Sequence, residues 1–239
     1  MGEVRKGNIE SAGERMRKQI LGVNIDDITI DQAVQIVASW LYKGGKRFIV
    51  TTNPEFIVTA EEDLLFKKIL NKADLSIPDG AGLKLSGKIK NTFPGVDFME
   101  KLIELVAEKA FTVGFLGGRG QVAERTVERL KKKYPALNVK FVSEEPDDIP
   151  KLDILFVAFG HPKQEYWIYE NLPKLNVGVA MGVGGSFDFL SGKVPRAPLW
   201  VRKIRMEWLF RLIIQPRRIK RQRRLFKYVT LILWQRFSA

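Results

Sequence analysis

The carboxylate best placed to act as a catalyst, Asp79, lies between Pro78 and Gly80 at the end of a short apolar segment. A carboxylate in that place can cap the helix that follows it, which is the more common role for an isolated Asp. It can also act as a general base, because burial would raise its pKa towards the range in which it accepts a proton from a hydroxyl group. Position alone leaves both interpretations open.

Glycines in the segment 114–120 indicate a candidate phosphate site. Gly117, Gly118 and Gly120 stand between a predicted strand and a predicted helix. Glycines let the backbone approach an anion closely, and a helix N-terminus presents free N–H groups to it. The spacing does not match the G-x-G-x-x-G pattern of dinucleotide-binding folds, so a simple tight turn explains the same residues equally well.

A second polar turn follows Pro162 at another predicted helix start. Lys163 and Gln164 beside the N–H groups of that helix suit a diphosphate or the hydroxyl groups of a sugar. The alternative is an exposed first turn in which Glu165 complements the helix dipole.

The chain has no Cys and a single His, His161, which argues against a metal site and against a Ser-His-Asp triad. We therefore predict no metal, no cofactor and a structural role for His161.

Alternating strands and helices must position these residues. Asp31 is expected to cap an amphipathic first helix, and Pro54 to begin a helical stretch that runs to residue 72. Strands are predicted over 47–52, 74–77, 111–116, 139–142, 153–159 and 177–181, with further helices over 98–109 and up to residue 133. This order indicates an α/β fold with a mainly parallel, Rossmann-like sheet and flanking helices. Such sheets bind ligands at the carboxyl ends of their strands, where the polar and glycine-rich segments fall.

The distribution of charge divides the chain into a nearly neutral body and a basic tail. Residues 196–239 hold 13 Lys/Arg and one acidic residue, Glu207, whereas residues 1–195 carry a net charge of +1. We predict a flexible leader over 1–19, an α/β domain over 20–195 and a basic amphipathic helical appendage over 196–239. A tail with this charge requires an anionic partner, which can be nucleic acid or an acidic lipid surface.

Apolar side chains within the tail favour the lipid surface. Trp200, Ile204, Trp208 and Leu212 recur every four residues and predict one apolar helix face. Such a face among Lys and Arg is typical of a membrane-docking helix in an anionic interface, and without a membrane it would pack against a second copy of the chain. Because no segment resembles a signal peptide or could span a bilayer, we expect a cytoplasmic protein, peripheral on the inner face of the cell membrane. The residues predicted to bind the membrane or a diphosphate are Arg211, Arg217, Arg218, Arg221 and Arg224.

Short motifs recur along the chain in a characteristic order. They are Thr51-x-Asn53, Ala73-Asp74 with Pro78-Asp79-Gly80-x-Gly82, Gly95-x-Asp97, Pro162-Lys163-Gln164-Glu165, Gly182-Val183-Gly184-Gly185-x-Phe187-Asp188, and Arg196-Ala197-Pro198-x-Trp200 with Glu207-Trp208-x-x-Arg211. Over about residues 20–220 this series resembles the WecG/TagA/CpsF glycosyltransferases, glycosyltransferase family 26. The Arg that this family has just before Gly95 is missing, since Asn91-Thr92-Phe93-Pro94 stands there, so we expect an Arg of the tail to take its place.

The resemblance implies an inverting, metal-independent transfer of N-acetylmannosamine, or its uronic acid, from a UDP donor to undecaprenyl-diphosphate-linked N-acetylglucosamine, for wall teichoic acid or another surface polysaccharide. Residues 20–195 would then be the glycosyltransferase domain. Asp79 matches the family's catalytic base, which makes that role the favoured one. The alternative is a nucleic-acid-binding α/β protein, but the Trp and Leu residues of the tail favour a membrane, so no nucleic acid is expected as a partner. The residues and the resemblance together predict substrate binding by Thr51, Asn53, Gly80, Gly117, Gly118, Lys163, Gln164, Gly184, Gly185 and Asp188.

Overall fold

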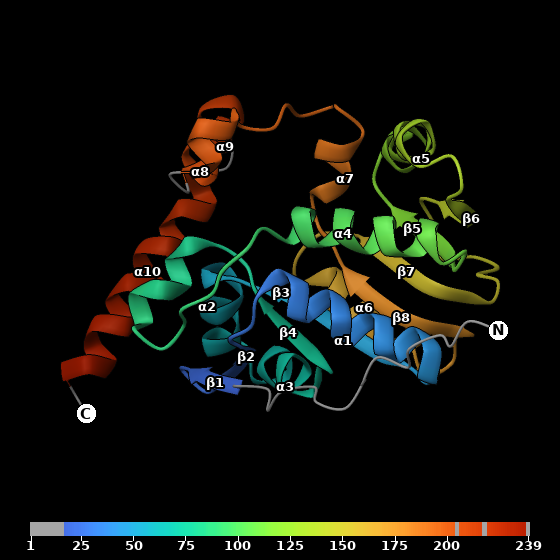
Figure 1. Ribbon diagram of the computed structural model, residues 1–239. Coiled ribbons are helices and arrows are strands. Elements are labelled where there is room, and N and C mark those ends of the chain that lie inside the picture. Colours follow the sequence, from blue (N-terminus) through green and yellow to red (C-terminus); the bar gives the residue numbers. More distant parts are fainter. Residues whose placement is uncertain (1–16, 204–205, 217–218, 238–239) are drawn as a thin grey trace, which may run out of the picture.

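A six-stranded sheet with helices on both faces forms the centre of the computed structural model, which describes residues 17–203, 206–216 and 219–237 (Figure 1). The strands lie in the order β4-β3-β8-β7-β5-β6, and all of them are parallel. The predicted α/β fold with a mainly parallel sheet is therefore confirmed. The strands are β3 (Arg47–Thr52), β4 (Leu75–Pro78), β5 (Thr112–Gly117), β6 (Asn138–Ser143), β7 (Leu152–Ala158) and β8 (Val177–Gly182).

The order of the strands brings distant parts of the chain together. β3 is the first strand of this sheet along the chain and β8 is the last, yet the two are neighbours, with Ile49 opposite Met181. β4 lies on the other side of β3, with Thr52 opposite Pro78. Because parallel strands end at the same edge of a sheet, the segments that follow β3, β4 and β8 meet there.

Alternate residues of each strand face two separate cores. In β3, Ile49 packs into one core, whereas Phe48 and Val50 pack into the other. The first core lies under α1 (Ile30–Lys43), α4 (Gly95–Glu108), α5 (Val122–Lys133) and α7 (Ser186–Leu190). The second lies under α2 (Pro54–Glu62), α3 (Leu64–Lys72) and α6 (Lys163–Asn171), and it also takes residues from the C-terminal helix α10 (Ile219–Phe237).

A small antiparallel hairpin precedes the sheet. Its strands are β1 (Arg17–Ile20) and β2 (Val23–Asp26), and the buried Ile20, Val23 and Ile25 join the second core. Arg17 forms an ion pair with Asp26, with Nε and Oδ1 3.0 Å apart, so this strand begins inside the predicted leader of residues 1–19. Residues 17–19 of the predicted leader therefore belong to this hairpin, and residues 1–16 lie outside the described part of the chain.

Two helix boundaries differ from the sequence-based expectation. Thr29, not Asp31, caps α1, because the Thr29 side chain accepts from the backbone N–H of Gln32 while the Gln32 side chain accepts from that of Thr29. The expected single helix over 54–72 is broken at Asp63, whose side chain caps α3 by accepting from Phe66 N. A side chain that caps a helix inside an apolar pattern starts a new helix in a new direction.

The C-terminal helices are separate elements: α8 (Leu199–Lys203), α9 (Glu207–Ile214) and α10. One continuous helix from Trp200 to Leu212 was expected, and this is wrong because α8 and α9 are distinct, while Ile204 of the expected apolar face lies outside the described residues. Met206 N donates to Val201 O, five residues back, which interrupts the regular helical pattern. Figure 1 shows α10 beside α2, and all three helices away from α5 and β6. Among the described residues, no helix has both the length and the apolar character needed to cross a bilayer.

Candidate active site

The carboxyl ends of β3 and β4 place Thr51, Asn53 and Asp79 together. Asn53 caps α2, with its side-chain oxygen accepting from Glu55 N at 2.9 Å and Phe56 N at 3.2 Å, and its side chain also hydrogen-bonds to Asp79. A Cβ added to Gly95 would lie 3.1 Å from Thr51 Cγ2 and 3.8 Å from Asp79 Oδ2. The start of α4 therefore lies directly against this pair, which leaves no room there for a larger residue.

Asp79 is held by backbone groups on two sides. Its own N–H donates to Thr52 O at 2.8 Å, and its Oδ1 accepts from Gly95 N at 3.3 Å. The short 3₁₀ helix η1 (Ala81–Ser86) that follows Asp79 has no side-chain cap, so the expectation that Asp79 caps the next helix is wrong. Asp79 instead accepts from the first residue of α4, where Pro94 cannot provide a capping side chain.

The surroundings of Asp79 raise its pKa to about 7. Burial of the carboxylate is the largest cause, and the negative charge of Glu207 acts in the same direction. The hydrogen bond from Gly95, the positive charge of Arg211 and the hydrogen bond from Asn53 all lower the pKa, but they do not offset the burial. A carboxyl group with this pKa can exchange a proton near neutral pH.

Arg211 of α9 reaches the loop that follows β8. A Cβ on Gly185 would collide with Nη2 of Arg211 and would come within 3.4 Å of Asp188 Oδ2, so the guanidinium group lies directly against the glycine. The Arg211 guanidinium also lies over the Phe189 ring, 4.4 Å from its centroid. The structure thus brings Gly185 and Asp188 to the same place as an arginine that acts on Asp79.

Gln164 lies at the start of α6 and is only 1% exposed. Its side-chain oxygen accepts from Gly160 N at 3.2 Å and from Gly184 N at 2.9 Å, while its Nε2 donates to Glu165 Oε1 at 2.6 Å. Gln164 therefore ties the loop after β7 to the loop after β8. Its predicted contact with substrate, like that of the exposed Lys163 beside it, stays a prediction.

The glycine turn after β5 already holds a carboxylate. Gly117 and Gly118 have positive φ angles of 91° and 87°, as a tight turn requires. At the end of the same turn, Gly120 N and Gln121 N donate to Glu144 Oε1 at 2.7 Å and 3.0 Å. These N–H groups bind an anionic group, which is the interaction considered from the sequence. That group is the carboxylate of Glu144, which directly follows β6. Phosphate binding at this turn is thus still a prediction.

The predicted tail arginines have different places. The Arg224 guanidinium pairs with Glu55 of α2, with Nη1 and Oε1 3.1 Å apart, so it helps to attach α10 to the body. Arg217 and Arg218 lie outside the described residues, and so does the side chain of Arg221. Glu207, the one acidic residue of the tail, was quoted only as part of a motif, although its isolation among 13 positive charges could have marked it as a functional contact.

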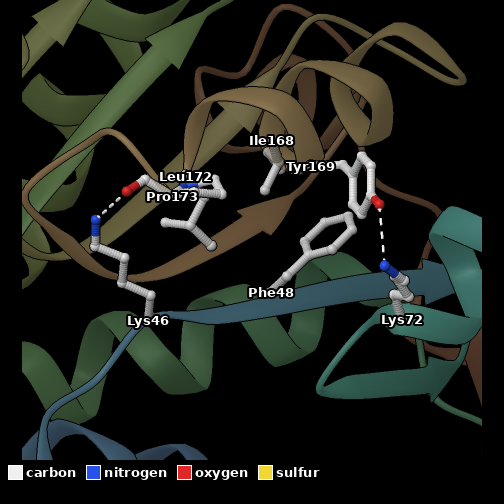
Figure 2. Close-up of a pocket in the computed structure, with 7 residues that line it drawn as sticks. All are labelled: Lys46, Phe48, Lys72, Ile168, Tyr169, Leu172 and Pro173. Atoms are coloured by element: carbon white, nitrogen blue, oxygen red, sulfur yellow. Dashed lines mark hydrogen bonds between the residues drawn. The ribbon is translucent and has the colours of Figure 1, made fainter.

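A pocket lies away from the predicted site residues. It has a volume of about 370 Å³, and Figure 2 shows Lys46 and Lys72 on its two sides. Lys46 Nζ donates to Pro173 O at 2.6 Å and Lys72 Nζ to the Tyr169 hydroxyl at 3.3 Å. It sits near the amino end of β3, so none of the predicted site residues lines it. Nor does the described part of the chain contain three or more His, Asp or Glu placed to hold a metal ion.

The site combines a carboxylate that titrates near neutral pH with a nearby arginine, at the carboxyl edge of a parallel sheet. These are the groups that a transferase needs to move a proton and to bind an anionic group. The chain belongs to the glycosyl transferase WecG/TagA/CpsF family, whose sequence profile matches residues 18–239. It is therefore a glycosyltransferase that uses a UDP-sugar.

Two relatives are N-acetylglucosaminyldiphosphoundecaprenol N-acetyl-beta-D-mannosaminyltransferases. The protein from Bacillus spizizenii is 34% identical over 210 residues, which is 82% of each chain. The protein from Staphylococcus aureus strain NCTC 8325 is 30% identical over 230 residues, which is 89% of the present chain and 91% of the relative.

Proposed function

We propose that the chain transfers N-acetylmannosamine from UDP to undecaprenyl-diphosphate-linked N-acetylglucosamine, with inversion at the anomeric carbon. Both relatives carry this transfer in their names, and the similarity extends over most of each chain. The uronic acid of the same sugar is the alternative donor. The product feeds a surface polymer such as wall teichoic acid.

The observation that carries this proposal is the environment of Asp79. In an inverting transfer, a base removes the proton of the acceptor hydroxyl as its oxygen attacks the anomeric carbon, and the bond from that carbon to UDP breaks on the opposite face. The pKa of Asp79, raised by burial to about 7, lets the carboxylate take that proton at neutral pH. Asn53 and the Gly95 N–H hydrogen-bond to this carboxylate and orient it.

The departing UDP needs positive charge or N–H groups beside its diphosphate. Arg211 supports this role, because it lies at Gly185 and Asp188 and its charge reaches Asp79. The segment in which the family has an Arg is used otherwise in this chain, since Asn91 donates from its backbone N and its side chain to Asp27 at 2.8 Å and 3.1 Å. Arg211 then takes the place of the missing Arg, and Lys163 and the helix N-termini add to it.

The lipid-linked acceptor requires a protein that works at a membrane surface. The exposed apolar side chains of the tail include Trp200 at 66%, Phe226 at 74% and Trp234 at 70% exposure, and they lie among its basic residues. Each basic residue near an anionic surface contributes about 1 kcal/mol to binding. The protein is accordingly cytoplasmic and docks on the inner face of the cell membrane through residues 196–239.

A transfer assay tests the proposal. Purified chain is incubated with a short-chain polyprenyl-diphosphate N-acetylglucosamine and, in turn, with UDP-N-acetylmannosamine, its uronic acid and UDP-N-acetylglucosamine. We expect product with one of the first two donors and a kcat/KM that falls below about pH 7, as Asp79 becomes protonated. Absence of product with all donors contradicts the proposal.

Flotation with anionic and neutral vesicles, beside a nucleic-acid shift assay, tests the proposed docking on the membrane. Only the anionic vesicles should retain the protein.

A further inference from the structure

Arg196 lies in the segment that joins the α/β body to the C-terminal helices. Its Nη1 is 2.6 Å from Asp97 Oδ1 and 3.9 Å from Glu100 Oε2, both on α4. Its Nε and Nη2 bind the two carboxylate oxygens of Glu207, the first residue of α9, at 3.1 Å and 3.3 Å. One guanidinium group therefore connects the start of α4 to the start of α9.

The residues that Arg196 connects belong to the surroundings of Asp79. α4 begins with Gly95, which donates to Asp79, and Asp97 lies two residues further on. On α9, Glu207 and Arg211 are four residues apart and thus share one helix face. Their charges act on the Asp79 carboxylate with opposite signs. The same ion network thus touches both helices that reach the base.

A second contact joins the same residues. The Phe189 ring of α7 lies close to two guanidinium groups, with that of Arg211 4.4 Å and that of Arg196 5.7 Å from the ring centroid. A planar guanidinium can stack on a ring and bind carboxylates through its edge at the same time, which an ammonium group cannot do. Arg196 fits both conditions, with its side chain 18% exposed.

We propose that Arg196 is a positioning residue that clamps α9 onto α4 and thereby sets Glu207 and Arg211 against Asp79. This rests on the function proposed above, in which Asp79 is the base and Arg211 binds the leaving group. Without the Arg196 guanidinium group, Glu207 and Asp97 would be neighbouring negative charges that repel each other. We expect α9 to move away from the site as a result. Transfer would then fail although the α/β body remained folded.

Arg196→Gln tests the clamp, and Arg47→Gln is its matched control. Arg47 also pairs with a carboxylate, Asp74, at 3.2 Å, but at the amino end of the sheet. We expect Arg196→Gln to lower kcat at least tenfold, with a melting temperature close to that of the wild type and faster proteolysis between residues 196 and 206. Arg196→Lys should recover part of the activity, since it keeps the charge but loses the fork. Arg47→Gln should change neither kcat nor the proteolysis of that segment.

Glu207→Gln gives a readout that a purely structural role would not move. Gln can still accept from Arg196, so α9 stays protected, but the negative charge beside Asp79 is gone. The groups that face Asp79 are then Asn53, the Gly95 N–H and Arg211, all of which lower its pKa, so the acid limb of kcat/KM should move to lower pH. An unchanged limb contradicts the proposal.

Normal kcat and normal protection in Arg196→Gln would also overturn it. If that variant does not fold, Asp97→Ala removes the acceptor on α4, opens the clamp from that side and is held to the same criteria. Proteolysis needs no turnover, so a wild-type protein that is protected but shows no transfer refutes the proposed function and not the clamp.

Discussion

The α/β body and the C-terminal helices bury their apolar residues in different ways. The body sandwiches its sheet between two cores, so nearly all of its large apolar side chains are covered. Of the fourteen large apolar side chains that are exposed among the described residues, ten belong to residues 199–237. Yet α10 is also part of a core, because Tyr228 and Ile232 are buried against α2 and its neighbours.

This contrast shows that α10 has two faces with different tasks. One face completes the second core and is attached by Arg224 to Glu55 and by Lys227 to Glu62. The other carries Phe226 and Trp234 into solvent. Removal of the whole tail would therefore uncover core residues as well as remove the face proposed to dock on the membrane, and only point substitutions separate the two effects.

The largest effect is expected within the body. Asp79→Asn keeps the shape of the side chain and its acceptor for Gly95 N but removes the base, so turnover should fall by about 10²-fold or more. The melting temperature should not fall, because the substitution removes a buried charge. Steady-state transfer rates and thermal unfolding measure the two quantities. Asp147→Asn, on an exposed loop, is the control, and near-normal turnover of Asp79→Asn would exclude the base assignment.

The second prediction separates the two faces of α10. Tyr228→Ala removes a fully buried aromatic side chain and should lower the free energy of unfolding by about 3–5 kcal/mol. Trp234→Ser removes an exposed one, so it should change that free energy by about 0.5 kcal/mol at most and should reduce flotation with anionic vesicles. Urea unfolding and flotation of both variants test this. If Trp234→Ser floats as the wild type does, this face of α10 does not dock.

Sequence patterns predict the body better than the tail. Strands β3 to β8 were expected within one or two residues. The central strands β3, β5, β7 and β8 are short, mostly apolar segments, as strands buried on both faces require, whereas the edge strand β6 is only partly buried and is interrupted by the exposed Lys140. The four-residue period from Trp200 to Leu212 instead suggested one helix. In the structure, Met206 N donates to Val201 O at the break between α8 and α9. Arg196 then joins the start of α9 to Asp97, which is far away in the sequence, so a local pattern cannot reveal this arrangement.

The candidate site shows the same limit. Thr51, Asn53 and Asp79 could be chosen in advance because they end strands that must meet at one edge. The sequence could not show that Glu144 supplies the anion at the glycine turn, or that the Gln164 amide is engaged by Gly160, Gly184 and Glu165. Both facts depend on which loops become neighbours, and that follows from the strand order.

The last prediction concerns the pH dependence of the body's stability. Burial raises the pKa of Glu165 from 4.5 to about 8, so the folded state keeps a proton that the unfolded chain releases. Stability is therefore lost as pH rises between about 5 and 8. Glu165→Gln removes this contribution yet still accepts from Gln164, so its unfolding free energy should fall by about 3 kcal/mol less than that of the wild type between pH 5.5 and pH 8. Urea unfolding at pH 5.5 and pH 8 measures the difference, with Glu145→Gln, an exposed carboxylate, as control.

The titratable neighbours of Glu165 remain in both proteins: they are Glu55 and His161, whose Nδ1 lies 3.6 Å from Glu165 Oε2. An identical pH dependence in the variant would therefore mean that Glu165 is already ionised in the fold.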